Sequence, residues 1–249
     1  MEFLGIERCP FCGNTDIMKS KLHEGEYYCK DWFGGCGSRL FLPITADGLT
    51  KGLAIQPYHK DAANRSDFGE TINHLKYWKN LGRKEKLELI SDAVSRIKKS
   101  GVIKNLVAAE DLGSLLIVPA PSSKDRDIQH VYAIAQGLAT PEYRYVEALL
   151  KKTCVESKRK ERGSNFSEGD FSCTYTLNGL PTLIVDDTYE EGATLRACIK
   201  ELQKNGAGHI YFLSLCKNTG GGIKKDGVGT AESRQNGPSV EVLTEDIPF

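Results

Sequence analysis

The sequence predicts an α/β protein in which a mainly parallel sheet is flanked by helices. Two observations lead to this fold class. Three apolar runs have the length and composition of buried strands, at residues 115–121, 181–187 and 209–216. Segments with helical periodicity separate them, at 128–139 and 194–207. Because strand, helix and strand at these lengths form parallel β-α-β units, we expect one sheet with both faces covered over residues 111–218.

Two shorter regions precede this domain and one follows it. Residues 1–42 are rich in cysteine and glycine, and residues 43–110 are expected to be mainly helical and to form a helical hood. Helical spacing covers 68–80 and 84–100, and the apolar positions of the second helix are Leu87, Ile90, Val94 and Ile97. Residues 219–249 are polar and glycine-rich, which predicts a flexible tail.

Composition excludes some classes of protein. The 249 residues include 33 Lys and Arg and 33 Asp and Glu, so net charge gives no argument for a polyanionic partner. No stretch is apolar for the length of a membrane span, so we expect no membrane association. The first residues, MEFLGIERCPFC, lack a basic region followed by an apolar run. The expected location is therefore the cytoplasm.

The amino-terminal cysteines predict a structural zinc site. Cys9 and Cys12 have knuckle spacing, and Cys29 and Cys36 follow after sixteen residues with six residues between them. Four thiolates close a tetrahedral site and leave no open position for catalysis. The alternative is four unmetallated thiols or a disulfide pair. The other cysteines lack such spacing and are expected to be reduced and mostly buried: Cys154, Cys173, Cys198 and Cys216.

Two acids end the second predicted strand. Asp186 and Asp187 come directly before a turn, and a helix starts near Gly192. Ligands of open α/β sheets bind at this carboxyl edge, and a helix N-terminus suits a phosphate. Carboxylates suit ribose hydroxyls or a magnesium ion that the ligand carries. The pattern predicts a sugar phosphate site, and the alternative is a pair of acids that caps a helix.

The stretch LIVDDTYEEGATL, residues 183–195, resembles the phosphoribosyl-pyrophosphate (PRPP) motif of type I phosphoribosyltransferases. More of the chain is similar to the competence-protein ComF family, which combines such a domain with an amino-terminal zinc ribbon. The similar segments are the four-cysteine knuckle, residues 69–77 (GETINHLKY), residues 118–121 (VPAP) and residues 160–171. Together with the PRPP motif they lie in the family's order over residues 9–194.

The resemblance implies roles for individual residues. Asp186 and Asp187 would hold the ribose of PRPP, and Glu190 would accept a proton from an incoming base. The 5′-phosphate loop would comprise Thr188, Glu191, Gly192, Ala193 and Thr194. Independently of the resemblance, a short polar loop after a strand is a natural anion site, so the pyrophosphate contacts are expected from Ser122, Ser123 and Lys124. Magnesium would enter with the substrate.

Two segments depart from the family pattern. Glu191 stands where a threonine or alanine usually lines the phosphate pocket. Residues 126–130 read RDIQH, whereas the family usually has RGFNQ. A carboxylate about 4–5 Å from a phosphate costs on the order of 1–4 kcal/mol. Three functions therefore remain open: a PRPP-dependent enzyme, a non-catalytic DNA-processing adaptor that kept the fold, and a sensor that binds a nucleotide without chemistry.

The chain ends in Asp246, Ile247, Pro248 and Phe249, which is similar to the acidic tip of bacterial single-stranded-DNA-binding proteins. That resemblance implies docking on a DNA-repair or replication protein, through a terminal phenylalanine and acids that steer the encounter. The alternatives are chance or a tail that packs on its own domain. Tyr77 and Trp78 lie in a basic stretch that suits single-stranded DNA, although such charges more often form a solvated helix face. DNA uptake, repair or processing is the biological role that these resemblances imply.

Overall fold

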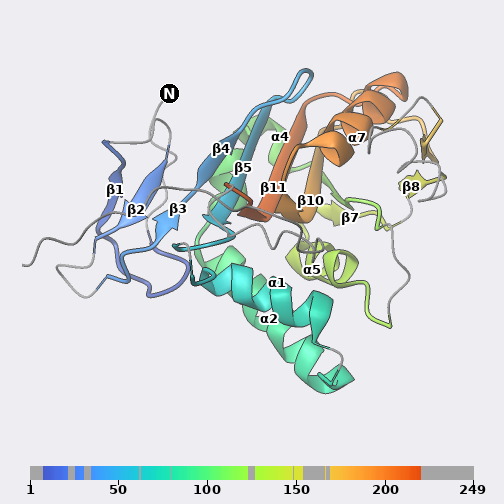
Figure 1. Cartoon of the computed structure of the whole chain (residues 1–249). Coiled ribbons are helices and arrows are strands. Elements are labelled where there is room, and N and C mark those ends of the chain that lie inside the picture. The colour runs from blue at the N-terminus through green and yellow to red at the C-terminus, as the bar shows by residue number, and fades with distance from the viewer. Residues whose placement is uncertain are drawn as a thin grey trace, which may run out of the picture.

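The computed structural model describes residues 8–21, 26–30, 35–61, 63–78, 80–122, 127–147, 149–153, 166 and 169–219. In this part of the chain a six-stranded sheet forms the centre of the molecule (Figure 1), in the order β4-β5-β11-β10-β6-β7. All neighbouring strands are parallel except β4 and β5. The strands are β4 (Leu42–Ile44), β5 (Lys51–Pro57), β6 (Leu116–Pro119), β7 (Arg144–Tyr145), β10 (Thr182–Tyr189) and β11 (Ile210–Lys217).

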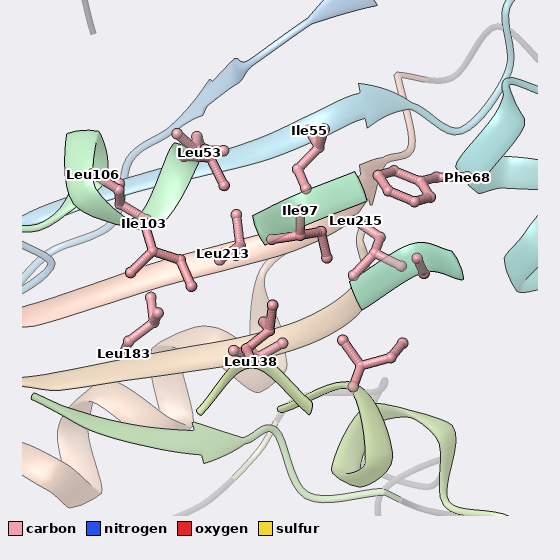
Figure 2. Packing of buried hydrophobic residues seen from close by; sticks show 14 of the residues in the cluster. Leu53, Ile55, Phe68, Ile97, Ile103, Leu106, Leu138, Leu183, Leu213 and Leu215 are labelled. Carbon is pink, nitrogen blue, oxygen red and sulfur yellow. The ribbon is translucent and has the colours of Figure 1, made fainter. Parts of the chain in front are cut away.

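Helices cover both faces of this sheet. One face carries α1 (Asp67–Tyr77), α2 (Arg83–Lys99), α3 (Val102–Leu106) and α5 (His130–Leu138), and the other carries α7 (Ala193–Lys204). The short helix α4 (Ala109–Leu112) leads into β6. Figure 2 shows the first face, where Leu53, Leu183 and Leu213 from three strands meet Ile97 and Leu138 from the helices. The predicted fold class, a mainly parallel sheet flanked by helices, is confirmed.

Strands β4 and β5 lie in the region that was expected to be mainly helical. They form an antiparallel pair, and β5 continues the main sheet by pairing in parallel with β11. Their turn contains Asp47 and Gly48, and Gly48 has a φ of +76°. Asp-Gly between two apolar runs is a strong hairpin pattern, but the longer helical periodicity after it dominates the segment and favours a helical prediction. The main sheet therefore combines β4 and β5, which precede residue 111, with four strands from residues 111–218.

The two predicted helices of the second region form as α1 and α2. The Ser66 hydroxyl caps α1 by accepting a hydrogen bond from the Gly69 amide, at 3.1 Å. In α2, Ile90 and Ile97 are buried as the spacing predicts, but Leu87 is 45% exposed. Leu87 lies in the first turns of α2, outside the stripe that faces the core.

A small antiparallel sheet lies at one end of the molecule (Figure 1). It consists of β1 (Ile17–Lys19), β2 (Tyr27–Cys29) and β3 (Arg39–Leu40). Its knuckle residue Phe11 contacts the hood helices α1 and α2: the Phe11 ring packs edge-on against Phe68, with centroids 5.0 Å apart, and the Arg96 guanidinium lies 5.7 Å from its centroid. The amino-terminal unit is thus packed on α1 and α2.

A second antiparallel pair, β8 (Leu150–Lys152) and β9 (Phe171–Cys173), packs beside α7. Of the cysteines outside the amino-terminal group, Cys198 and Cys216 are buried, Cys173 is half-buried, and Cys154 lies outside the described residues. Among the described helices, none combines the length and the apolar character that crossing a membrane requires.

Candidate functional site

Two cavities meet at the carboxyl end of β10. The first has a volume of about 350 Å³, lies at the start of α7, and is lined by Asp186, residues 188–195 and Phe212. The second has a volume of about 230 Å³, lies on the side of α1, and is lined by Tyr58, Lys76, Tyr77, Thr188, Glu190 and Asn218. Because Thr188 and Glu190 line both cavities, groups held in the two are neighbours.

The two consecutive acids of β10 point to opposite faces of the sheet. Successive side chains of a strand alternate between its faces. Val185 belongs to the cluster beneath α1, α2 and α5, and Ile184 belongs to the cluster beneath α7. Asp186 therefore follows Ile184 and lines the first cavity, whereas Asp187 follows Val185 toward the hood helices.

Asp187 is buried in a network of charged groups. The Lys76 ammonium of α1 donates a hydrogen bond to Asp187 Oδ1 at 2.8 Å, and Nε2 of His130, at the start of α5, lies 2.6 Å from Oδ2. Burial on its own would raise the pKa of Asp187, but the hydrogen bond with His130 and the charge of Lys76 outweigh it and lower this pKa to about 2. Both carboxylate oxygens are thereby engaged.

Asp186 has the opposite electrostatic character. Its Oδ1 accepts a hydrogen bond from the Asp187 backbone amide at 2.8 Å. Burial, and then the nearby charge of Asp187, raise the pKa of Asp186 to about 7. The ionised form of Asp186, beside the first cavity, is therefore less favoured than that of Asp187.

The loop between β10 and α7 closes the first cavity. Glu190 Oε1 accepts a hydrogen bond from the Asn218 side chain at 3.0 Å, and the Arg196 guanidinium donates to the Glu191 carbonyl at 2.8 Å. Within the described part of the chain, no lysine or arginine lines this cavity and no ion pair involves the Glu191 carboxylate. The amino end of α7 therefore supplies the positive potential, and the acids oppose it.

Gly192 is required by the shape of this loop. It has a φ of +72°, and a Cβ at this position would lie 2.8 Å from the Tyr189 hydroxyl. We expect Gly192→Ala to lower the free energy of unfolding by about 1–2 kcal/mol, from the left-handed backbone alone. Urea unfolding measures this. Gly113→Ala is the matched control, because Gly113 has a φ of −68° and nothing within 4 Å of the added carbon. Equal stability of the two variants would contradict the prediction.

The structure gathers most of the residues proposed for the PRPP site. Asp186, Thr188 and residues 190–194 line the first cavity together. Asp187 is adjacent but faces the hood, and Ser122 lines neither of the two cavities. Ser123, Lys124 and the four tail residues Asp246, Ile247, Pro248 and Phe249 lie outside the described residues.

Sequence reasoning missed Lys76, His130, Tyr58 and Asn218. His130 left a detectable pattern: it occupies the apolar stripe of α5, four residues before Ile134, where it is buried. A histidine on a buried helix face after the first strand of a β-α-β unit requires a polar partner. Lys76 adjoins the buried Leu75, but its partner lies 111 residues away, and no local pattern indicates that pairing.

The four amino-terminal cysteines converge as predicted. Their sulfurs all lie within 4.8 Å of one another, with Cys9 and Cys36 at 3.6 Å and Cys12 and Cys29 at 3.5 Å. Four sulfurs at about 2.3 Å from a zinc ion form a tetrahedron with edges of about 3.8 Å. The donor set and its spacing therefore fit a zinc ion, and these pairs are not disulfide-bonded.

Comparison with solved structures finds phosphoribosyltransferases. A hypoxanthine phosphoribosyltransferase from Staphylococcus aureus aligns in two crystal forms, at 12% and 14% identity, over 56% and 54% of this chain and 69% and 66% of its own, with TM-scores of 0.36 and 0.35. A hypoxanthine phosphoribosyl transferase from Trypanosoma cruzi aligns at 14% identity over 54% of this chain and 65% of its own, with a TM-score of 0.32. No protein-family model and no curated protein matches the chain.

Proposed function

We propose that this chain binds phosphoribosyl pyrophosphate, or a related nucleotide, as its magnesium complex at the first cavity. The observation that carries the proposal is the position of Asp186, which lines a cavity at the carboxyl edge of a parallel sheet beside the start of α7. A carboxylate accepts hydrogen bonds from ribose hydroxyls, and the amides at residues 192–194 suit a 5′-phosphate. The magnesium ion would offset the carboxylates of Glu190 and Glu191.

Transfer of the phosphoribosyl group would follow from the same arrangement. Loss of magnesium pyrophosphate leaves an oxocarbenium-like centre, which the surrounding carboxylates stabilise. Glu190 lines both cavities, and in this function it would accept a proton from an acceptor base in the second one. The aromatic rings of Tyr58 and Tyr77 would line that acceptor site.

Calorimetric titration of the zinc-loaded protein with PRPP tests the proposal. We expect micromolar binding with magnesium and loss of at least tenfold in affinity in Asp186→Asn, since one hydrogen bond to a charged group contributes about 1.5–3 kcal/mol. The matched control is Asp92→Asn. Asp92 is an exposed acid of α2, and its ion pair with Arg96 contributes only about 0.3–0.5 kcal/mol to stability. No heat at millimolar PRPP, with folded protein, would reject the proposal.

A ComF-like role as a DNA-processing adaptor is the second candidate function. The observation that favours it is the set of carboxylates in the first cavity, which has no lysine or arginine among its described lining residues. In that function the tail would recruit a repair or replication protein, and exposed Tyr77 and Trp78 would contact single-stranded DNA. Deleting residues 247–249 separates the candidates: it abolishes the adaptor's partner binding but leaves PRPP binding intact.

A further inference from the structure

The most unusual group outside the cavities is the buried carboxylate of Asp187. Only 6% of its surface is exposed, its Oδ1 is bound by Lys76 and its Oδ2 by His130. It lines neither cavity. A buried carboxylate that lines neither cavity does not meet a ligand held there, so its function lies in what it holds in place.

The backbone of Asp187 holds the side chain of Asp186 in place. Its backbone amide donates to Asp186 Oδ1, which leaves Oδ2 of Asp186 for a ligand. Lys76 also lies 3.5 Å from the Thr188 hydroxyl, so one side chain from α1 contacts the two residues of β10 that directly follow Asp186. Lys76 thereby brings its positive charge against the residue whose amide binds the Asp186 carboxyl.

We propose that Lys76 is a positioning residue: by pairing with Asp187 it fixes Asp186 as the acid that meets the ligand and sets its charge state. The proposal rests on the proposed function for its ligand, but its geometry is independent of that ligand. Because Lys76 belongs to the hood helix α1, this helix supplies a positive charge to the site.

Titratable groups from every adjoining element surround the acid pair. They are Lys76 from α1, His130 from α5, Cys216 from β11 beside Asp187, and Cys198 from α7 beside Asp186. Burial raises the pKa of both thiols, so they are neutral at physiological pH. The charge of Lys76 lowers the pKa of Asp186, against burial and the charge of Asp187. Removing that charge should therefore make Asp186 harder to ionise.

The test is a carboxyl-carbon NMR titration of Asp186 in the zinc-loaded full chain. We expect a midpoint near 7 in the wild-type protein, an upward shift of about one pH unit or more in Lys76→Gln, and recovery in Lys76→Arg. Glutamine retains a hydrogen-bond donor but not the charge. An unchanged midpoint in folded Lys76→Gln overturns the proposal. Should that variant not fold, a wild-type midpoint near the ordinary value of 3.8 overturns it as well.

PRPP titration of the same proteins shows whether Lys76 controls the charge of Asp186 or only stabilises the fold. Lys76→Gln should bind about tenfold more weakly at pH 7, and raising the pH to about 8.5 should recover most of the loss, because Asp186 is then ionised. A loss that pH does not recover indicates a purely structural role and overturns the proposal. If the wild-type protein binds no PRPP but the midpoint shifts, the proposed function fails and the positioning role stands.

Discussion

Replacement of Asp187 by asparagine is expected to lower the free energy of unfolding by about 3–5 kcal/mol at neutral pH. The variant keeps the volume of the side chain but removes the charge that Lys76 and His130 share. The Lys76 side chain is 20% exposed, so its ammonium would be left largely buried beside a neutral amide. Urea unfolding followed by circular dichroism measures the loss.

The neighbouring acid is the matched control, and it is expected to behave in the opposite way. Asp186 has a pKa raised from 3.8 to about 7, so folding disfavours its ionised form, and the resulting loss of stability grows between about pH 4 and 7 and is complete above pH 7. Asp186→Asn should therefore gain stability relative to the wild-type protein as the pH rises from about 4 to 7, and the advantage should stay constant from pH 7 to 8. Equal losses in both variants would show that the two acids share one role.

The pH dependence of the Asp187 effect has a definite sign. Its pKa is lowered from 3.8 to about 2, so its stabilising contribution is complete above about pH 4 and disappears as the pH falls through 2. The difference between wild-type protein and Asp187→Asn should stay constant from pH 5 to 8 and shrink below pH 4. If the difference in stability between the two proteins shrank between pH 6 and 8, a titratable group other than Asp187 would be responsible for it.

Removal of metal from the four-cysteine cluster is expected to unfold the amino-terminal unit. Structural zinc sites with such donor sets contribute on the order of 10 kcal/mol, and the three strands here comprise only two or three residues each. We expect about one zinc per chain by elemental analysis, and rapid proteolysis within residues 8–42 after chelation. Cys29→Ser should reproduce the chelated state without a chelator.

Cys173→Ser serves as the control for the metal experiment, because Cys173 is half-buried in β9, outside the cluster. It should retain zinc and resist proteolysis. Chelation should also disturb α1 and α2, since Phe11 packs between Phe68 and Arg96. Zinc content below a tenth of an equivalent in freshly purified protein would contradict the assignment of the cluster as a zinc site.

Much of the sheet could be predicted because buried parallel strands are continuous apolar runs. The runs that contain Val118, Ile184 and Phe212 each became a central strand, and the periodic segments between them became α5 and α7. Strand β5 was missed although Asp47 and Gly48 mark its hairpin. Pairing of β5 with β11 joins residues far apart in sequence, and neither strand carries a local indication of its partner.

The site was predictable along one strand and unpredictable across elements. Asp186 and the loop to Thr194 are contiguous, so a motif suffices to group them. Asp186 and Asp187 face opposite sides of the sheet because side chains of a strand alternate with a period of two residues. The apolar residues before them already predict this difference. The partners Lys76 and His130 depend on how α1 and α5 pack, which no sequence spacing encodes.

The packing of Phe11 limits which positions of this protein can change independently in evolution. Its ring is held by an aromatic side chain from α1 and a guanidinium from α2, while Tyr27 packs against Phe41 at the entry to the main sheet, with ring centroids 6.5 Å apart. The amino-terminal unit is therefore not an interchangeable module. A lineage that lost it would expose Phe68 to solvent, so substitutions at positions 11, 68 and 96 are expected to occur together across relatives.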